Sequence, residues 1–227
     1  MANKFVVEGE KLLDEMLRED SSLIDCIYYT ENCSVSIPET VSSKAISEKE
    51  LQRISGLKSP HHVLAVLHIT EVDIVPGDQE GMLLLLDEVK DPGNLGTLLR
   101  TADWFGVQTI ICSPTTVELY NPKVVQASMG AIFRVQVHYK ALTTVIPELK
   151  SVGYEFFGAD MEGENAFTIH FPKKSALIMG SESQGLSDQL KDLSTPITIP
   201  KVGKTESLNV AMAAGIILSR YAAQTLI

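Results

Sequence analysis

The sequence predicts an α/β protein whose larger part is a mainly parallel β-sheet with helices on both faces. Three observations carry this prediction. From Met82 onward, short apolar strands alternate with helical stretches, as in "MLLLLDEV" before a helix at 94–105. The strands are apolar without alternation, which is typical of strands buried on both faces. Finally, a glycine-rich turn follows three of the strands, at the sheet edge where ligands bind in such folds.

Residues 82–227 are expected to form this larger domain. Its strands are expected at 82–89, 107–113, 134–139, 154–160, 175–180 and 197–200, and its helices at 94–105, about 121–129, about 142–150, about 187–192 and 207–223.

Residues 1–70 predict a smaller α/β domain. An extended start passes into a helix in "FVVEGEKLLDEML", and strands are expected in "IDCIYYT" and "HHVLAVLHI". Between these strands lies a predicted helix, "SEKELQRIS", in which Ser47 and Glu50 have the spacing of a capping box. The polar segment 71–81 contains Pro76 and two glycines and is predicted to be a linker.

The composition excludes several classes of protein. With 44% hydrophobic and 21% charged residues among 227, the chain is an ordinary globular protein. No apolar run approaches the roughly 20 residues of a membrane span, and no signal peptide precedes the first helix, so a cytoplasmic protein with no membrane partner is expected. Three cysteines without a C-x-x-C pair, and histidines without ligand spacing, predict neither disulfides nor a metal site.

The net charge of −10 argues weakly against a nucleic-acid partner, because phosphate binders usually carry a basic surface. The charge is uneven, however. Residues 90–140 contain five Lys or Arg residues and three acidic ones. An acidic protein can bind RNA through one local basic surface, so the overall sign does not decide the class of partner.

The first glycine-rich turn is "DEVKDPGNLGTLLRTA", residues 87–102. Asn94 is expected to cap the helix that follows. Arg100 falls almost opposite the apolar stripe of this helix and leans over Gly96, which has no side chain, so the guanidinium is expected to reach the strand-end cleft beside Asn94. The alternative is an ordinary capped turn with a solvated arginine.

The second turn is "ALIMGSESQGLS", residues 176–187. Gly180 and Gly185 at the end of a strand let a ligand approach the backbone closely. Glu182 is a candidate acceptor for ribose or amine donors, and its alternative role is to accept hydrogen bonds from loop amides. No G-x-G-x-x-G is present, which argues against a dinucleotide-binding site.

The third turn lies within "ITIPKVGKTESLNVAMAAGIILSRY", residues 197–221. Its "GKT" is not a phosphate-binding loop, because Thr198 stands where that motif needs a glycine. Ser207 is expected to cap the last helix. Small residues at 211–215 permit close packing, either within the fold or at a subunit interface.

Three such turns in this order resemble the motifs of the SpoU (TrmH-like) family of RNA ribose 2′-O-methyltransferases, in the SPOUT superfamily. The matching segments are "DPGNLGTLLRTA", "MGSESQGLS" and "IPKVGKTESLNVAMAAGIIL". Residues 1–70 are similar to the family's N-terminal substrate-binding domain through "FVVEGEKLL" and "LKSPHHVLAVL". Only four residues precede the first of these segments, where family members often have a basic stretch.

The resemblance implies a C-terminal trefoil knot that binds S-adenosylmethionine, a homodimer, and an RNA substrate, ribosomal or transfer, rather than DNA. The cofactor-binding residues that it implies are Gly180, Ile199 and Leu208, together with Gly185 and Gly203 of the second and third motifs. The polar residues expected at the catalytic site are Arg100, Asn94, Glu182, Ser207 and Asn209.

Among these residues, Arg100 is predicted to be the centre of catalysis and Asn94 to orient it. A guanidinium with a pKa above about 12 is a poor base. We therefore expect Arg100 to bind the neighbouring phosphate and to stabilise the developing alkoxide. Two alternatives stay open at this point: a non-catalytic RNA-binding or ribosome-assembly factor that keeps the fold, and an enzyme acting on a small molecule or a base.

Overall fold

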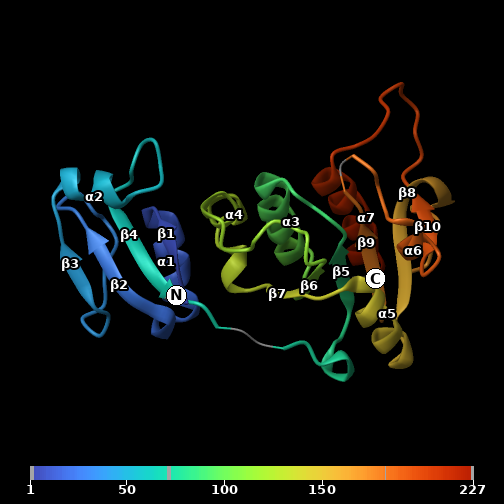
Figure 1. Cartoon of the computed structure of the whole chain (residues 1–227), viewed down its shortest axis with the longest axis horizontal. Coiled ribbons are helices and arrows are strands. Elements are labelled where there is room, and N and C mark those ends of the chain that lie inside the picture. The colour runs from blue at the N-terminus through green and yellow to red at the C-terminus, as the bar shows by residue number, and fades with distance from the viewer. Residues whose placement is uncertain (1–2, 71–72, 182, 226–227) are drawn as a thin grey trace.

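The computed structural model describes residues 3–70, 73–181 and 183–225, which form two sheets with their helices (Figure 1). The larger sheet has six strands in the order β10-β8-β9-β5-β6-β7, and every neighbouring pair is parallel. Its strands are β5 Met82–Leu86, β6 Thr109–Cys112, β7 Gln136–Tyr139, β8 Glu155–Asn165, β9 Ser175–Met179 and β10 Thr195–Thr198.

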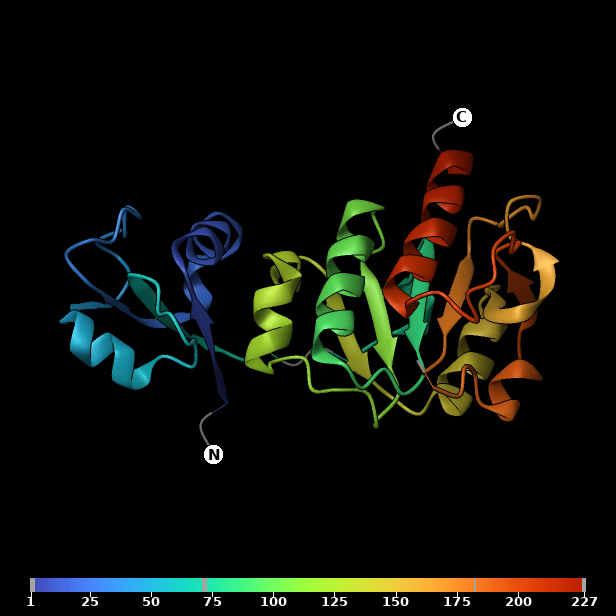
Figure 2. The ribbon, with the colours of Figure 1, turned by 90° about the horizontal axis from the view of Figure 1, so that it is seen from above.

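The helices that accompany this sheet lie on both of its faces. They are α3 Pro92–Trp104, α4 Pro122–Ser128, α5 Leu142–Ser151, α6 Asp188–Lys191 and α7 Val210–Thr225, with short 3₁₀ turns at Pro76–Asp78 and Ala131–Phe133 (the second is η3). Figure 2 shows α3 and α7 side by side on one face.

Strand β5 explains why both faces are covered. All five of its residues are buried. Leu84 and Leu86 belong to one apolar cluster with α3 and α7, whereas Leu83 and Leu85 belong to another with α5. Since successive side chains of a strand point to opposite faces, an all-leucine strand needs helices on both sides. The parallel, two-sided sheet predicted from the sequence is therefore confirmed.

The N-terminal sheet has four strands in the order β1-β4-β2-β3. Its elements are β1 Lys4–Glu8, α1 Glu10–Glu19, β2 Ile24–Tyr29, β3 Ser43–Ala45, α2 Glu48–Ile54 and β4 Val63–His68, with a 3₁₀ turn at Ser21–Leu23. The capping box of Ser47 and Glu50 is present at the start of α2. Strand β3 was not expected, because its three residues are exposed and carry no apolar pattern.

Two predicted helix caps are wrong. Asp91, not Asn94, caps α3, because its carboxylate accepts a hydrogen bond from the Asn94 backbone N–H at 2.9 Å. Helix α7 begins at Val210, so Ser207 lies outside it, and Asn209 Oδ1 accepts from the backbone N–H groups of the residues at 211 and 212. In both places two residues of suitable type stand within three positions, and the local pattern does not distinguish them.

Within the described ranges, no helix is long and apolar enough to cross a membrane. The same part of the chain contains no group of three His, Cys, Asp or Glu side chains that could bind a metal ion.

Candidate active site

The turn between β5 and α3 is fixed by hydrogen bonds to its neighbours. Asp87 donates its backbone N–H to the carbonyl of Met179 at 2.8 Å, and the backbone N–H of Glu88 bonds Ser113 Oγ at 2.9 Å. The buried Asp87 carboxylate also accepts from the Ser187 backbone N–H at 3.2 Å. One carboxylate thus joins the first and second glycine-rich turns. Asp87 was not predicted as a site residue, although an acidic residue directly after five apolar ones is a usable signal.

Arg100 lies two turns further along α3, on its exposed side. It lines a groove of about 570 Å³ between α3 and α7, with Thr97 and Trp104 on one wall and Asn209 and Met212 on the other. In the part of the chain that the structure describes, the side chain of Arg100 makes no hydrogen bond or ion pair. Its fork of five N–H donors is therefore available to an anion such as phosphate.

Gly96 has a different role from the one expected. A Cβ atom at this position would lie 2.4 Å from Ala127 Cβ and 2.9 Å from the Val124 carbonyl oxygen. Gly96 therefore allows α4 to pack closely against α3. It does not open a path for Arg100, because the space beside it is filled by α4.

Asn94 and Asn209 connect the first and third motifs. Asn209 Nδ2 donates to Asn94 Oδ1 at 2.9 Å, while Asn209 Oδ1 caps α7. Further along the same helices, a Cβ atom at Gly215 would lie 3.5 Å from Thr101 Cγ2, so α3 and α7 run in the same direction. Asn209 rather than Arg100 is the side chain seen to contact Asn94. The bond brings both helix N-termini to one point of the sheet edge.

The second turn doubles back on itself. Ser181 and Gly185 exchange two backbone hydrogen bonds of 3.0 Å. A Cβ atom at Gly180 would lie 2.1 Å from the carbonyl carbon of Gly185, so only glycine fits there. Gly180 is buried and Gly185, with a φ of 69°, is exposed. Glu182 lies outside the described residues.

The third segment is open to solvent. Ile199 is half-buried against the main apolar cluster, and every residue from 200 to 209 is exposed, including Gly203, Ser207 and Leu208. Residues 199–208 donate no backbone hydrogen bond to other described residues. Of the expected site residues, the structure brings Asn94, Arg100 and Asn209 together. It does not place Gly180, Ile199 or Leu208 in the groove that Arg100 lines.

The unbonded backbone of 199–208 is suited to a ligand bound mainly through main-chain groups. Backbone N–H and C=O groups need partners once they are buried, and a ligand that covers this segment would supply them. A ligand that covers this segment would meet both hydrogen-bond donors and acceptors of the main chain.

The fold and the site together define a class of parallel α/β proteins with an arginine-lined groove between α3 and α7. The model of the SpoU rRNA Methylase family matches residues 81–219. The chain belongs to this family, which confirms the resemblance seen in the three motifs.

Relatives in other organisms extend beyond the matched region. The chain is 30% identical to the 23S rRNA (guanosine(2553)-2′-O)-methyltransferase RlmP of Bacillus subtilis, over 95% of this chain and 87% of that protein. It is 29% identical to the 23S rRNA (guanosine-2′-O-)-methyltransferase RlmB of Neisseria meningitidis, over 96% of this chain and 95% of the relative.

Solved structures share the fold. A Porphyromonas gingivalis protein assigned to the TrmH family of RNA methyltransferases has a TM-score of 0.87 and 35% identity, over 98% of this chain and 90% of that one. An AdoMet-bound rRNA methyltransferase of Sinorhizobium meliloti has a TM-score of 0.84 and 28% identity, over 99% and 88% of the two chains.

Proposed function

We propose that this chain transfers a methyl group from S-adenosylmethionine to a ribose 2′-hydroxyl of RNA, with 23S ribosomal RNA as the substrate. The observation that carries the proposal is Arg100, a guanidinium without a described partner in a groove that also contains Asn209. Both relatives compared above, which match nearly the whole chain, are named as 23S rRNA guanosine 2′-O-methyltransferases. Ribosomal RNA as substrate agrees with a cytoplasmic protein.

In this proposal Arg100 acts by charge. A ribose hydroxyl is weakly acidic. The rate of methyl transfer therefore depends most on holding the 2′-oxygen in position and on a cation beside the negative charge that develops on this oxygen. The guanidinium binds the adjacent phosphate in a bidentate manner and faces the 2′-oxygen. As this oxygen bonds the methyl carbon and the bond from that carbon to sulfur breaks, the hydroxyl proton passes to solvent water. The hydrogen bond between Asn209 and Asn94 fixes the starts of α3 and α7 in position relative to that oxygen.

Backbone groups of the second and third motifs hold the cofactor in this proposal, through Gly180, Gly185, Ile199, Gly203 and Leu208. S-adenosylmethionine, when bound there, supplies the methyl group on an electrophilic sulfonium. Glu182 and Ser207 belong to the same two motifs and are part of the proposed site.

The proposal includes a trefoil knot in the last third of the chain. Membership of the SpoU family supports it, because the three motifs of that family imply this knot. In the same proposal, residues 1–70 are a separate RNA-binding domain, 71–81 a linker and 82–227 the catalytic domain.

A homodimer is the proposed assembly, with α3 and α7 at the interface. Three large apolar side chains on or beside these helices are exposed in the single chain: Trp104 by 83%, Met212 by 60% and Leu208 by 49%. Trp104 and Met212 line the same groove, and exposed apolar side chains that lie close together are typical of an interface with another protein. Sedimentation equilibrium of the wild-type protein and of Met212→Glu tests this assembly, and a monomeric wild type contradicts it.

The function is tested by incubating the protein with 23S rRNA, transfer RNA and methyl-labelled cofactor, followed by mass spectrometry of the nucleosides. A 2′-O-methylated guanosine from 23S rRNA is the expected product. Calorimetric titration of the cofactor is run in parallel. Cofactor binding without RNA methylation would point to another substrate, and the absence of cofactor binding would indicate a non-catalytic RNA-binding protein.

A further inference from the structure

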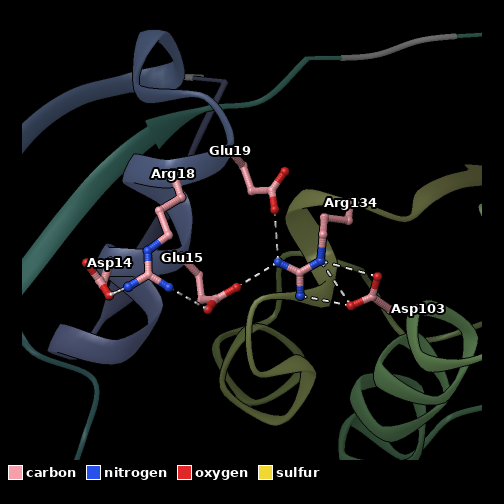
Figure 3. Close-up of polar contacts among 6 residues, drawn as sticks. All are labelled: Asp14, Glu15, Arg18, Glu19, Asp103 and Arg134. Carbon is pink, nitrogen blue, oxygen red and sulfur yellow. Dashed lines mark hydrogen bonds and ion pairs between the residues drawn. The ribbon is translucent and has the colours of Figure 1, made fainter.

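Arg134, directly after η3, connects the two sheets of the molecule (Figure 3). On one side its Nε and Nη2 donate to the carboxylate of Asp103 in α3, with Nε distances of 3.0 and 3.2 Å and an Nη2 distance of 2.8 Å. On the other side Nη1 donates to Glu15 at 2.7 Å and to Glu19 at 3.2 Å, both in α1. One guanidinium therefore joins a helix of the N-terminal sheet to a helix of the six-stranded sheet.

The negative charges around Arg134 make its guanidinium necessary to the contact between α1 and α3. Three carboxylates converge on this single cation, and the side chain is only 29% exposed. The hydrogen bonds with Asp103, more than those with the two glutamates, raise the pKa of Arg134. Without the guanidinium, the carboxylates of α1 and α3 would face each other and repel, and they would lose hydrogen bonds that are partly shielded from water.

The surfaces beside Arg134 are complementary. Gly130 has a φ of 94°, and a Cβ atom at this position would lie 3.1 Å from Glu15 Cγ. The glycine therefore lets Glu15 pack closely against this turn. Gln126 Nε2 donates to the backbone carbonyl of Glu8 at 2.7 Å, and the rings of Phe5 and Tyr120 lie 4.5 Å apart. The region around α4 and η3 is thus the surface against which β1 and α1 pack.

We propose that Arg134 is a positioning residue for RNA methylation, which fixes the orientation of α1 relative to α3. Asp103 lies three residues after Arg100, within one turn of the same helix. The orientation of the N-terminal sheet is therefore set against the helix that carries Arg100. This inference rests on the proposed function: an RNA that is bound by residues 1–70 presents its ribose to Arg100 only while the two sheets keep this orientation.

A matched control lies on the same surface. Arg18 is in α1, pairs with Asp14 and, at 3.7 Å, with Glu15, and its side chain is 67% exposed. Arg18→Ala removes the same charge next to the same cluster, but it breaks no contact between the two sheets. Arg134→Lys keeps the charge and loses the planar fork that bonds Asp103 and the glutamates together.

The experiment compares wild type, Arg134→Ala, Arg134→Lys and Arg18→Ala. Methylation rates are measured against RNA concentration, cofactor affinity by calorimetry, and the distribution of interatomic distances by small-angle X-ray scattering. For Arg134→Ala we expect kcat/KM for RNA to fall about tenfold or more, because misplacement of a substrate by an ångström has effects of this size. Cofactor affinity stays at the wild-type value and the scattering distribution widens. Arg134→Lys gives intermediate values, and Arg18→Ala behaves as wild type.

The proposal is overturned if Arg134→Ala equals Arg18→Ala in both rate and scattering. It is also overturned if the Arg134→Ala variant loses cofactor affinity by the same factor as RNA methylation, because that result indicates damage within the catalytic sheet. Should Arg134→Ala not fold, Arg134→Lys and Glu15→Gln are compared with wild type and with Arg18→Ala instead. A wild-type protein that methylates no RNA contradicts the proposed function alone, since the scattering comparison still shows whether Arg134 fixes α1 against α3.

Discussion

The turn that leads into α3 and the segment that leads into α7 both start at the carboxyl edge of the six-stranded sheet, and they differ in how firmly they are fixed. The first turn bonds three neighbours, at Met179, Ser113 and Ser187. Residues 199–208 donate no backbone hydrogen bond to other described residues. The two segments are joined by the hydrogen bond from Asn209 to Asn94.

Under the proposed function, this difference separates two tasks of one site. Stabilising a charge in a transition state needs groups that do not move, and Arg100 is carried by the helix whose first turn is fixed. Binding a cofactor and a large RNA allows a segment to become ordered on contact with them. We therefore expect substitutions in the first turn to act on rate or folding, and substitutions in the third segment to act on binding.

Arg100→Ala gives the largest expected effect. Methyl transfer falls about 100-fold or more, the loss typical of removing one preorganised charge stabiliser. The melting temperature stays at the wild-type value, because the guanidinium of Arg100 makes no ion pair or hydrogen bond with another described residue. Lys150→Ala removes an equal charge from α5, on the other face of the sheet, and is expected to leave the rate unchanged. A rate near wild type for Arg100→Ala contradicts its assigned role.

A second pair of substitutions compares two glycines. Gly96→Ala places a methyl group 2.4 Å from Ala127 Cβ, and we expect it to lower the free energy of unfolding by about 1–3 kcal/mol through overpacking against α4. Gly203→Ala meets no atom within 4 Å and is expected to leave stability unchanged. Urea unfolding measures both, and equal midpoints would mean that α4 can move away from α3.

Asn209→Ala compared with Ser207→Ala tests where α7 begins. Loss of the Asn209 cap is expected to reduce stability by about 1 kcal/mol. Ser207→Ala changes an exposed side chain before the helix and costs less than about 0.5 kcal/mol. Thermal unfolding followed by circular dichroism distinguishes them, and the reverse order would restore Ser207 as the cap.

The smallest expected effect concerns proteolysis. Trypsin should cut first after Lys201 and Lys204, in the exposed third segment, and saturating S-adenosylmethionine should slow these cuts severalfold. Cleavage after Lys90, next to the fixed first turn, serves as the control and should be unaffected by the cofactor. Peptide mass spectrometry follows all three sites. If the cofactor protected all three sites equally, the third segment would not differ from the first turn in how firmly it is fixed.

Much of the fold was predictable because the patterns that define its strands and helices lie within short segments of the sequence. The all-apolar strands and the helical stripes of α3 and α5 repeat at short spacing, and the observed elements lie close to the expected ranges. Strand β8 was underestimated: it continues through the polar residues to Asn165, because its outer half pairs with β10 in solvent. No apolar pattern marks such an exposed extension.

The site was predictable in its residue types and less so in their contacts. Arg100 and Asn209 line one groove, and Asn209 bonds Asn94, but this bond between the two asparagines joins positions 115 residues apart. Arg134 was missed for the same reason. Its partners at positions 15, 19 and 103 come from two helices whose packing no short segment of sequence encodes.

Trp104 is the single tryptophan of the chain, and it stands 83% exposed in the same groove as Arg100. Its indole ring is thus a built-in fluorophore beside the proposed reaction. Any molecule that displaces water from the groove, whether RNA or a second copy of the chain, should shift its emission to shorter wavelength. Assembly and substrate capture can therefore be followed in real time on the unlabelled protein.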